Sequence, residues 1–204
     1  MIVLLASSAR ASEPRLLVEA SVEEVLRIVS NPDLKGLEKA AERRRQLRQA
    51  VSRRFDYTEM ARRSLATHWS RRSEPERQEF VDLFSKLLES DYAYKIETYS
   101  GEKIVVVDQQ IDGDYAKVRT AVRLKHEDVA IDYKMLKEDT DWKVYDVMIE
   151  GLSLVNNFRS QFNRIILSSS YDELIKTMRV RVADLDALVS PPARNHQGGT
   201  PGTP

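Results

Sequence analysis

The spacing of apolar residues changes its period near Gly101. Before that glycine, apolar residues recur every three or four positions, which is typical of amphipathic helices. After it, residues 103–149 alternate with a period of two, which indicates half-buried strands. Helical spacing returns after Ser153. The pattern therefore predicts a helical first half, a block of strands and two closing helices.

The first half divides into four predicted helices. Three of them cover residues 14–29, 34–55 and 56–67. The fourth begins at Ser73, which forms a capping-box pattern with Glu76. Its apolar residues form one long stripe that includes Phe80, Leu83, Phe84, Leu87, Leu88 and Tyr92. A helix with one apolar side must pack that side against another layer.

Four strands are expected next, over residues 103–108, 115–124, 129–136 and 142–150. The connections are short and Asp112-Gly113 is a hairpin signal, so the strands should form an antiparallel meander. The last strand is apolar on both alternating sets, so each face needs cover or one face lines a cavity. Gly151 gives the backbone freedom at the next corner, and Ser153 is a suitable N-cap.

These elements predict an α+β fold: a helical N-terminal half packed on a curved four-stranded antiparallel sheet. Two C-terminal helices, over residues 153–167 and 171–188, should pack back on the sheet. We expect a single domain over residues 12–189. Residues 1–11 resemble the end of a secretory signal peptide with an Ala-x-Ala cleavage pattern, although a disordered cytosolic N-terminus is the alternative. Residues 190–204 are rich in proline and glycine, and we predict a disordered tail.

Charge is balanced overall, with 32 basic and 32 acidic residues, but it is unevenly distributed. Residues 43–72 contain ten arginines and only two acidic residues, Asp56 and Glu59. A solvated helix face would explain this stretch, and so would docking to an acidic partner or to anionic headgroups. Nucleic-acid binding is disfavoured because no stacking aromatics or binding motif accompany the arginines.

Patterns that carry catalysis are missing from the sequence. There is no cysteine, which excludes disulfides, thiolate catalysis and zinc–thiolate sites. Glycines are too few for a phosphate-binding loop. The histidines, His68, His126 and His196, are scattered, and no metal-ligand spacing surrounds them. The residues therefore predict neither a metal site nor a cofactor, and their apolar stripes could form a core without any ligand.

Five segments of the chain are informative together: residues 55–69, 79–99, 129–136, 142–162 and 172–178. In their order and spacing they resemble the MlaC family of periplasmic phospholipid carriers, also called toluene-tolerance proteins. The resemblance covers about residues 16–178. One departure is Ala66, where the family is expected to carry glycine.

The resemblance implies a monomeric phospholipid carrier in the periplasm and no enzyme. Its expected partners are an inner-membrane ABC lipid transporter, which it would serve as the substrate-binding component, and an outer-membrane lipoprotein–porin complex. Such shuttling would maintain outer-membrane lipid asymmetry. At about 0.8 kcal/mol per methylene, two acyl chains of about 15 methylenes would cost roughly 24 kcal/mol to expose to water. A carrier must therefore enclose the chains in an apolar cavity, and it needs no acid, base or metal.

The predicted cavity takes residues from the long helix, the sheet and the helix after Gly151. Arg159 could reach a lipid phosphate, although a solvated or paired arginine is the simpler interpretation. Which face of each strand looks inward is not determined by the sequence. The predicted lipid-binding residues are Phe84, Leu87, Leu88, Tyr92, Val105, Val118, Val122, Ile131, Tyr133, Val144, Val147, Leu154, Phe158 and Phe162.

Two alternatives stay open at this stage. The first is a carrier of the same family for hopanoids or other polycyclic lipids. The second is a small enzyme with the same α+β arrangement, in which Tyr133 and Asp146 would supply the acid and the base. The lining of the pocket separates them, because an enzyme needs convergent ionisable groups and a carrier needs an apolar cavity. Lipid identity, the number of acyl chains and the direction of transport do not follow from the sequence.

Overall fold

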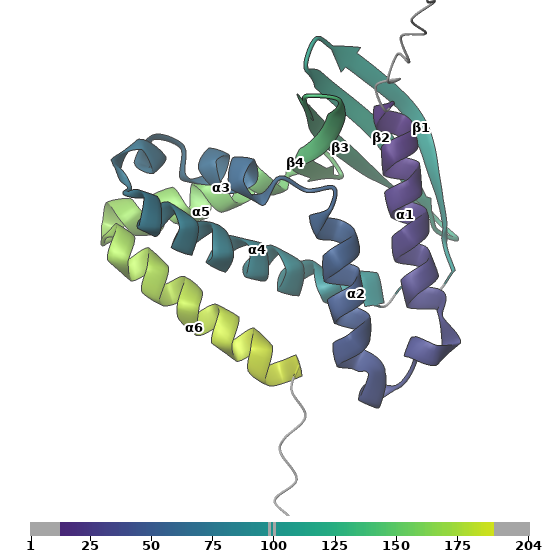
Figure 1. The fold of residues 1–204 in the computed structure, drawn as a ribbon, viewed down its shortest axis with the longest axis horizontal. Helices are drawn as coiled ribbons and strands as arrows, with labels where there is room; N and C mark the ends of the chain where they lie inside the picture. Colours follow the sequence, from purple (N-terminus) through teal and green to yellow (C-terminus); the bar gives the residue numbers. More distant parts are fainter. Residues whose placement is uncertain (1–12, 98, 100, 190–204) are drawn as a thin grey trace, which may run out of the picture.

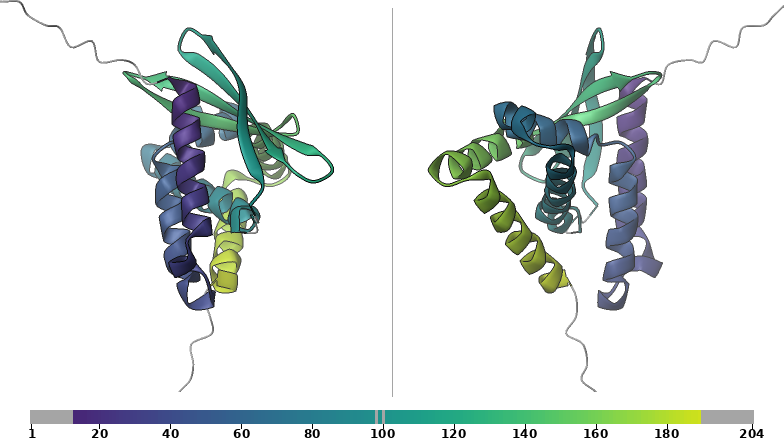
Figure 2. Two further views of the ribbon diagram at one scale, coloured as in Figure 1. Left: turned by 90° about the vertical axis from the view of Figure 1, so that its right-hand side faces the viewer. Right: turned by 60° about the vertical axis from the view of Figure 1, so that its left-hand side comes forward.

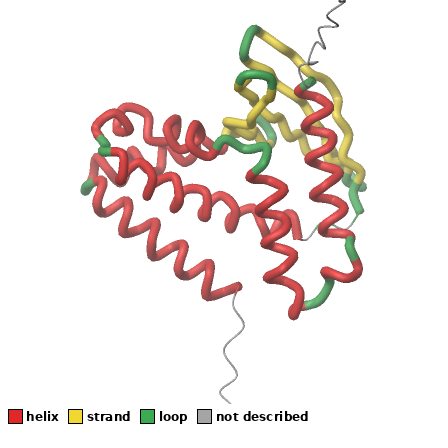
Figure 3. Tube along the Cα trace, viewed as in Figure 1, coloured by secondary structure: helices red, strands yellow, loops and turns green. Residues whose placement is uncertain are grey.

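Helices and strands occupy different parts of the molecule (Figures 1 and 3). The computed structural model describes residues 13–97, 99 and 101–189, so the predicted leader and tail lie outside the described residues. The six α-helices of this part are α1 (Pro14–Ser30), α2 (Ala40–Ser52), α3 (Tyr57–Leu65), α4 (Glu74–Glu97), α5 (Leu154–Ser168) and α6 (Tyr171–Val189). The strands are β1 (Lys103–Asp112), β2 (Tyr115–Arg123), β3 (Asp128–Glu138), β4 (Asp141–Ile149) and β5 (Leu152–Ser153).

Two of the predicted helices are shorter than expected. The helix predicted over residues 34–55 is interrupted by 3₁₀ turns at Pro32–Leu34 and Leu37–Lys39, and α2 begins only at Ala40. Gly36 lies between these turns with φ +91°, a conformation that glycine adopts readily and that ends a helix. The helix predicted over residues 56–67 ends at Leu65, because Ala66 leaves the helical region with φ +50° and ψ −120°. A 3₁₀ segment, Ala66–Arg71, follows it.

The sheet confirms the predicted antiparallel meander, with strand order β1-β2-β3-β4-β5. It has five strands in place of the predicted four, because the two-residue β5 pairs with the end of β4. Asp112 pairs with Tyr115 across the predicted hairpin, with Gly113 at φ +56° in the turn. Glu150 and Gly151 both have positive φ between β4 and β5. Ser153 is the N-cap of α5, where its Oγ accepts a hydrogen bond from the backbone N–H of Asn156 at 3.0 Å.

A β-bulge in β4 changes which of its residues share a face. Lys134 of β3 pairs with Asp146, but the next residue, Met135, pairs with Val144, so Tyr145 is the extra residue. Simple alternation would place Val144 and Val147 on opposite faces. The bulge brings both onto the same face, where they pack in one cluster with Trp142.

Buried apolar residues form two clusters. The first, which we call the helical core, consists of α3, α4, α5 and α6 residues centred on Phe80, Phe84, Phe158 and Phe162. The second, the sheet cluster, consists of Val18 from α1 with Ala116, Val118, Met135, Trp142, Val144 and Val147. Figure 2 shows α1 lying along one face of the sheet, while α6 lies away from it. Phe55 and Leu154 pack against both clusters.

Candidate functional site

One face of the sheet is apolar and only partly covered. We call it the inner face, and it is the face that carries the sheet cluster. Val118, Met135 and Val144 are fully buried there, with Val18 of α1 packed among them. At the other end of the same face the apolar side chains are only half-buried, namely Ile104, Val106, Val122, Val129, Ile131 and Ile149. The inner face therefore offers apolar surface that the described helices do not close.

Strand register shows that these residues share the face. Val122 of β2 pairs with Ile104 of β1 and with Val129 of β3. Two residues away on β2, Thr120 pairs with Val106 of β1 and with Ile131 of β3. Ile131 pairs in turn with Ile149 of β4. Directly opposed side chains in a sheet lie side by side on one face. The half-buried residues thus form one continuous patch across β1, β2, β3 and β4.

Thr120 and Tyr133 place polar groups among the apolar residues of the inner face, and both stay uncharged at neutral pH. Thr120 is buried, and its Oγ1 donates a hydrogen bond to the carbonyl oxygen of Ile131 at 2.8 Å. Burial raises the pKa of Tyr133 to about 12, although a hydrogen bond with Thr120 opposes the shift. The surface is therefore chemically suited to acyl chains and poorly suited to charged ligands.

The opposite, outer face of the sheet is polar. Cross-strand ion pairs run along it, with Lys117 Nζ 2.7 Å from Asp132 Oδ2 and Arg119 paired with Asp108. An antiparallel sheet commonly leaves one polar face of this kind toward water. The two faces of one sheet thus differ sharply in chemistry.

The structure distributes the predicted lipid-binding residues over three places. On the inner face lie Val118, Val122, Ile131, Tyr133, Val144 and Val147. Packed within the helical core are Phe84, Leu87, Leu88, Phe158 and Phe162, while Leu154 contacts both clusters. Val105 lies on the outer face, because it pairs with Ala121, which alternates with Thr120 and Val122. The side chain of Tyr92 lies outside the described residues.

The sequence prediction missed four residues of the half-buried part of the inner face: Ile104, Val106, Val129 and Ile149. The signal that could have found them is pairing, since a hairpin centred on Gly113 aligns Val106 with Thr120 when one bulge is allowed. Alternation alone cannot reveal that bulge, which lies between Val106 and Asp108 and shifts the register by one residue.

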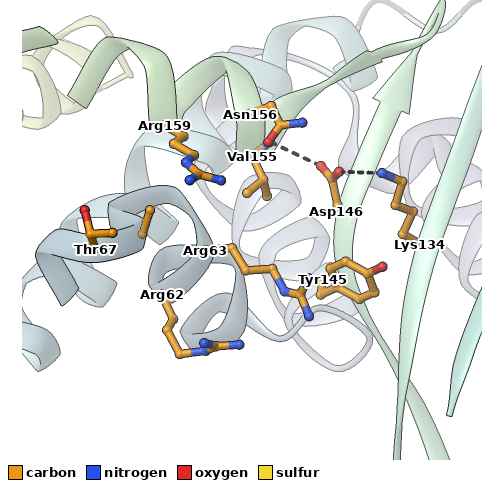
Figure 4. Close-up of a pocket in the computed structure, with 10 residues that line it drawn as sticks. Arg62, Arg63, Thr67, Lys134, Tyr145, Asp146, Val155, Asn156 and Arg159 are labelled. Atoms are coloured by element: carbon orange, nitrogen blue, oxygen red, sulfur yellow. Dashed lines mark hydrogen bonds and ion pairs between the residues drawn. The ribbon is translucent and has the colours of Figure 1, made fainter. Parts of the chain in front are cut away.

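A cleft lies between α3, α5 and the outer face of β3 and β4 (Figure 4). We call it the cationic cleft; its volume is about 460 Å³. Its charged lining comprises Arg62, Arg63, Lys134, Arg159 and Asp146, and its remaining lining residues are Ala66, Thr67, Tyr145, Val155 and Asn156. It is therefore quite unlike the inner face.

The acidic groups near the cationic cleft already have partners. Burial raises the pKa of Glu59, but hydrogen bonds from Arg62 and Arg63 outweigh that effect and leave it below its usual value. Asp146 is buried, and its carboxylate accepts hydrogen bonds from Ser153 Oγ at 2.7 Å and from the Val155 N–H at 3.1 Å. Asp146 thereby fastens the start of α5 to β4.

The candidate acid–base pair of the enzyme alternative is separated by the sheet. Tyr133 belongs to the inner face, whereas Asp146 lies on the outer face beside Lys134, with 3.5 Å between Lys134 Nζ and Asp146 Oδ2. The two groups cannot act on one substrate. Among the described residues no cluster of three or more histidine, aspartate or glutamate residues could hold a metal ion, and no described helix is long and apolar enough to span a membrane.

Comparison with known proteins agrees with this arrangement. The family model described as MlaC protein matches residues 19–180. The chain belongs to the MlaC family. This confirms the resemblance seen in the five sequence segments.

A solved structure that resembles this one contains a phospholipid. The phospholipid-binding protein from Ralstonia solanacearum, determined in complex with a phospholipid, matches this structure with a TM-score of 0.75 at 26% identity. The match covers 86% of this chain and 99% of that one. The intermembrane phospholipid transport system binding protein MlaC of Haemophilus influenzae is 25% identical over 121 residues, and the match spans just over half of each protein, 56%.

Proposed function

We propose that this MlaC-family protein is a periplasmic phospholipid carrier that encloses acyl chains against the inner face of its sheet. The observation that carries the proposal is the half-covered apolar patch around Val122 and Ile131. A layer of this kind is normally closed by another layer of the protein. A phospholipid is bound by the Ralstonia relative of the same fold, which supports acyl chains as the missing cover.

The physical requirement fits the chemistry of the patch. Enclosing an acyl chain stabilises the complex by about 0.8 kcal/mol for each methylene removed from water. Tyr133 and Thr120 add no charge, so nothing in the patch opposes hydrocarbon. Because the recognised part is hydrocarbon, we expect weak discrimination between headgroups. Direct bonding of the headgroup within the inner face is not required.

Transport between membranes is the further part of the proposal. The Haemophilus relative is an intermembrane phospholipid transport binding protein, which supports a carrier that receives lipid at one membrane and delivers it at the other. We propose an inner-membrane ABC lipid transporter and an outer-membrane lipoprotein–porin complex as its partners, and the periplasm as its location. No catalytic step is needed for this role, because the acyl chains are bound and released without any change in the covalent bonds of the lipid.

Native mass spectrometry tests the proposal. The protein is purified from a bacterial periplasm without detergent, and its intact mass is measured before and after organic extraction. We expect an additional mass of a two-chain phospholipid that extraction removes. A polycyclic lipid mass would support the hopanoid alternative. A folded protein with no bound lipid would contradict the proposed function.

A further inference from the structure

The cationic cleft contains more positive charge than its neighbours neutralise. Four cationic side chains from three separate elements line it: Arg62 and Arg63 from α3, Lys134 from β3 and Arg159 from α5. Figure 4 shows these side chains around one hollow, with Asp146 and Tyr145 on the sheet side. A cleft lined by one sign of charge concentrates the electric field and attracts ions of the opposite sign.

The local carboxylates do not cancel this charge. Glu59 forms ion pairs with both Arg62 and Arg63. The Arg63 guanidinium also stacks over the Tyr145 ring, 4.1 Å from the ring centroid. Asp146 is occupied by Ser153, Val155 and Lys134. Arg159 is exposed and has no ion-pair or hydrogen-bond partner within residues 13–97, 99 and 101–189. Asp56 acts on Arg62 electrostatically and already accepts a hydrogen bond from the Glu59 N–H. The carboxylates of Glu59, Asp146 and Asp56, which already have partners, thus face four cations.

The cleft is separate from the acyl-chain surface. Lys134 alternates along β3 with Tyr133 and Met135, both of which belong to the inner face. The sheet therefore lies between the cationic cleft and the inner face. A phosphate bound in the cleft would not belong to a lipid whose chains lie on the inner face.

Donor geometry indicates the class of ligand. A carboxylate has two oxygens, and one guanidinium satisfies both through a bidentate pair. Here, cations approach from α3, β3 and α5, with Thr67 and Asn156 as further hydrogen-bonding groups. An anion with three or more oxygens can accept hydrogen bonds from several directions at once, and arginine suits phosphate for this reason. The volume of about 460 Å³ also leaves space for an organic group attached to the phosphate.

We propose that the cationic cleft is a phosphate-binding site, distinct from the acyl-chain surface, which takes the phosphate of a lipid headgroup or free phosphate. In the first case, the protein would hold a membrane lipid by its headgroup while its cargo occupies the inner face. The site follows from the cleft alone and stands whether or not the proposed cargo is correct.

Titration of the full chain with inorganic phosphate by calorimetry tests the site at low ionic strength. The variant is Arg159→Gln. The Arg159 side chain makes no ion pair or hydrogen bond within the described residues, so its replacement should not affect folding. The matched control is Arg164→Gln, an exposed arginine of the same helix outside the cleft. We expect Arg159→Gln to weaken phosphate binding by about tenfold or more, and Arg164→Gln to change it by less than about twofold. Equal losses in the two variants, or no saturable phosphate binding by the unchanged protein, would overturn the proposal.

Vesicles separate the two sources of phosphate. Co-sedimentation is measured with phosphatidylcholine vesicles that contain or lack phosphatidylglycerol. Binding that needs phosphatidylglycerol, falls in Arg159→Gln and is displaced by inorganic phosphate assigns the site to a headgroup. Phosphate binding that depends on Arg159 without any vesicle effect assigns it to free phosphate. Tighter binding of an oligoglutamate peptide together with no phosphate binding would replace the proposal with an acidic protein partner.

Cargo content distinguishes this inference from the proposed function. Native mass spectrometry of Arg159→Gln should show the same bound lipid as the unchanged protein. If Arg159→Gln loses its cargo, the cleft belongs to the cargo site and the inference of a separate site is wrong. If the unchanged protein carries no lipid but binds phosphate through Arg159, the proposed function fails while the cleft assignment stands.

Discussion

The helical core and the inner face of the sheet are both apolar, yet only one of them is closed. Phe80 and Phe84 have no exposed surface, and their rings stack on each other at a centroid distance of 5.9 Å. Phe158 and Phe162 pack edge-on against them at centroid distances of 5.3–6.1 Å. Val122 and Ile131 on the inner face remain half-buried. An apolar stripe in a sequence therefore shows which side of an element avoids water. It does not show whether protein or ligand covers that side.

The difference divides the predicted cavity residues into two functional groups. Those in the helical core, such as Phe84 and Phe158, should act on stability, because closely packed rings leave no room for a ligand. Those on the open part of the inner face should act on lipid retention. Substitutions in the two regions should therefore produce opposite patterns of stability and binding.

The largest expected effect comes from Phe84→Ala. Removing a fully buried phenyl ring from the helical core should lower the free energy of unfolding by about 3–5 kcal/mol. Truncating the half-buried Val122 to alanine should lower the free energy of unfolding by less than about 1.5 kcal/mol. Urea denaturation of delipidated protein measures both. Similar costs at the two positions would break the distinction between a closed core and an open face.

A smaller effect is expected at Ala66, the residue with positive φ that ends α3. Its φ of +50° with ψ of −120° is a conformation that suits glycine and strains an alanine. Ala66→Gly should therefore raise the free energy of unfolding by about 1 kcal/mol. Ala183→Gly in the exposed middle of α6 is the control, and it should lower stability by about the same amount. Thermal or urea unfolding measures both variants. A destabilised Ala66→Gly would contradict the interpretation that the Ala66 backbone is strained.

The smallest effect concerns Glu89, which links the helical core to α2. Glu89 Oε2 lies 2.6 Å from Arg48 Nε of α2, and Tyr57 of α3 donates a hydrogen bond to Glu89 Oε1 at 3.3 Å. Burial raises the pKa of Glu89 above 4.5, and Arg48 and Tyr57 offset the shift only in part. The folded state thus holds this proton more tightly than the unfolded state does.

The sign of the pH dependence follows from that shift. As the pH rises from about 4.5 through the raised pKa, the unfolded state loses the proton first, so the wild-type protein loses stability relative to Glu89→Gln. Above the raised pKa the difference should stay constant. Urea unfolding of both proteins over a series of pH values measures it. A wild-type protein that gains stability relative to Glu89→Gln over this range would show that Arg48 outweighs burial.

Much of the fold could be predicted from the sequence because it depends on local signals. The change of period near Gly101, the hairpin at Gly113 and the N-cap at Ser153 are each encoded within a few residues. Gly36 is also a local signal, but an apolar pattern that continued past it concealed the break before α2. Ala66 has no such signal, because nothing in an alanine indicates a positive φ.

The site was harder to predict because it depends on register. One bulged residue, Tyr145, places Val144 and Val147 on the same face, and strict alternation separates them. A further bulge in β1 conceals the alignment of Ile104 with Val122. The cationic cleft combines residues from α3, β3 and α5, whose proximity no sequence spacing reveals. In the sequence, Arg62 and Arg63 were noted only as part of the basic stretch over residues 43–72.

Replacing one valine on each face of the sheet tests the central claim most directly. Val122 on the inner face and Val105 on the outer face are half-buried valines of adjacent strands, so Val122→Asp and Val105→Asp change the same chemistry on opposite sides. Native mass spectrometry measures bound phospholipid, and circular dichroism checks folding. Our account predicts that folded Val122→Asp carries no phospholipid, while Val105→Asp retains the wild-type amount. Lipid retained by folded Val122→Asp, or lost from folded Val105→Asp, would contradict the inner face as the acyl-chain site.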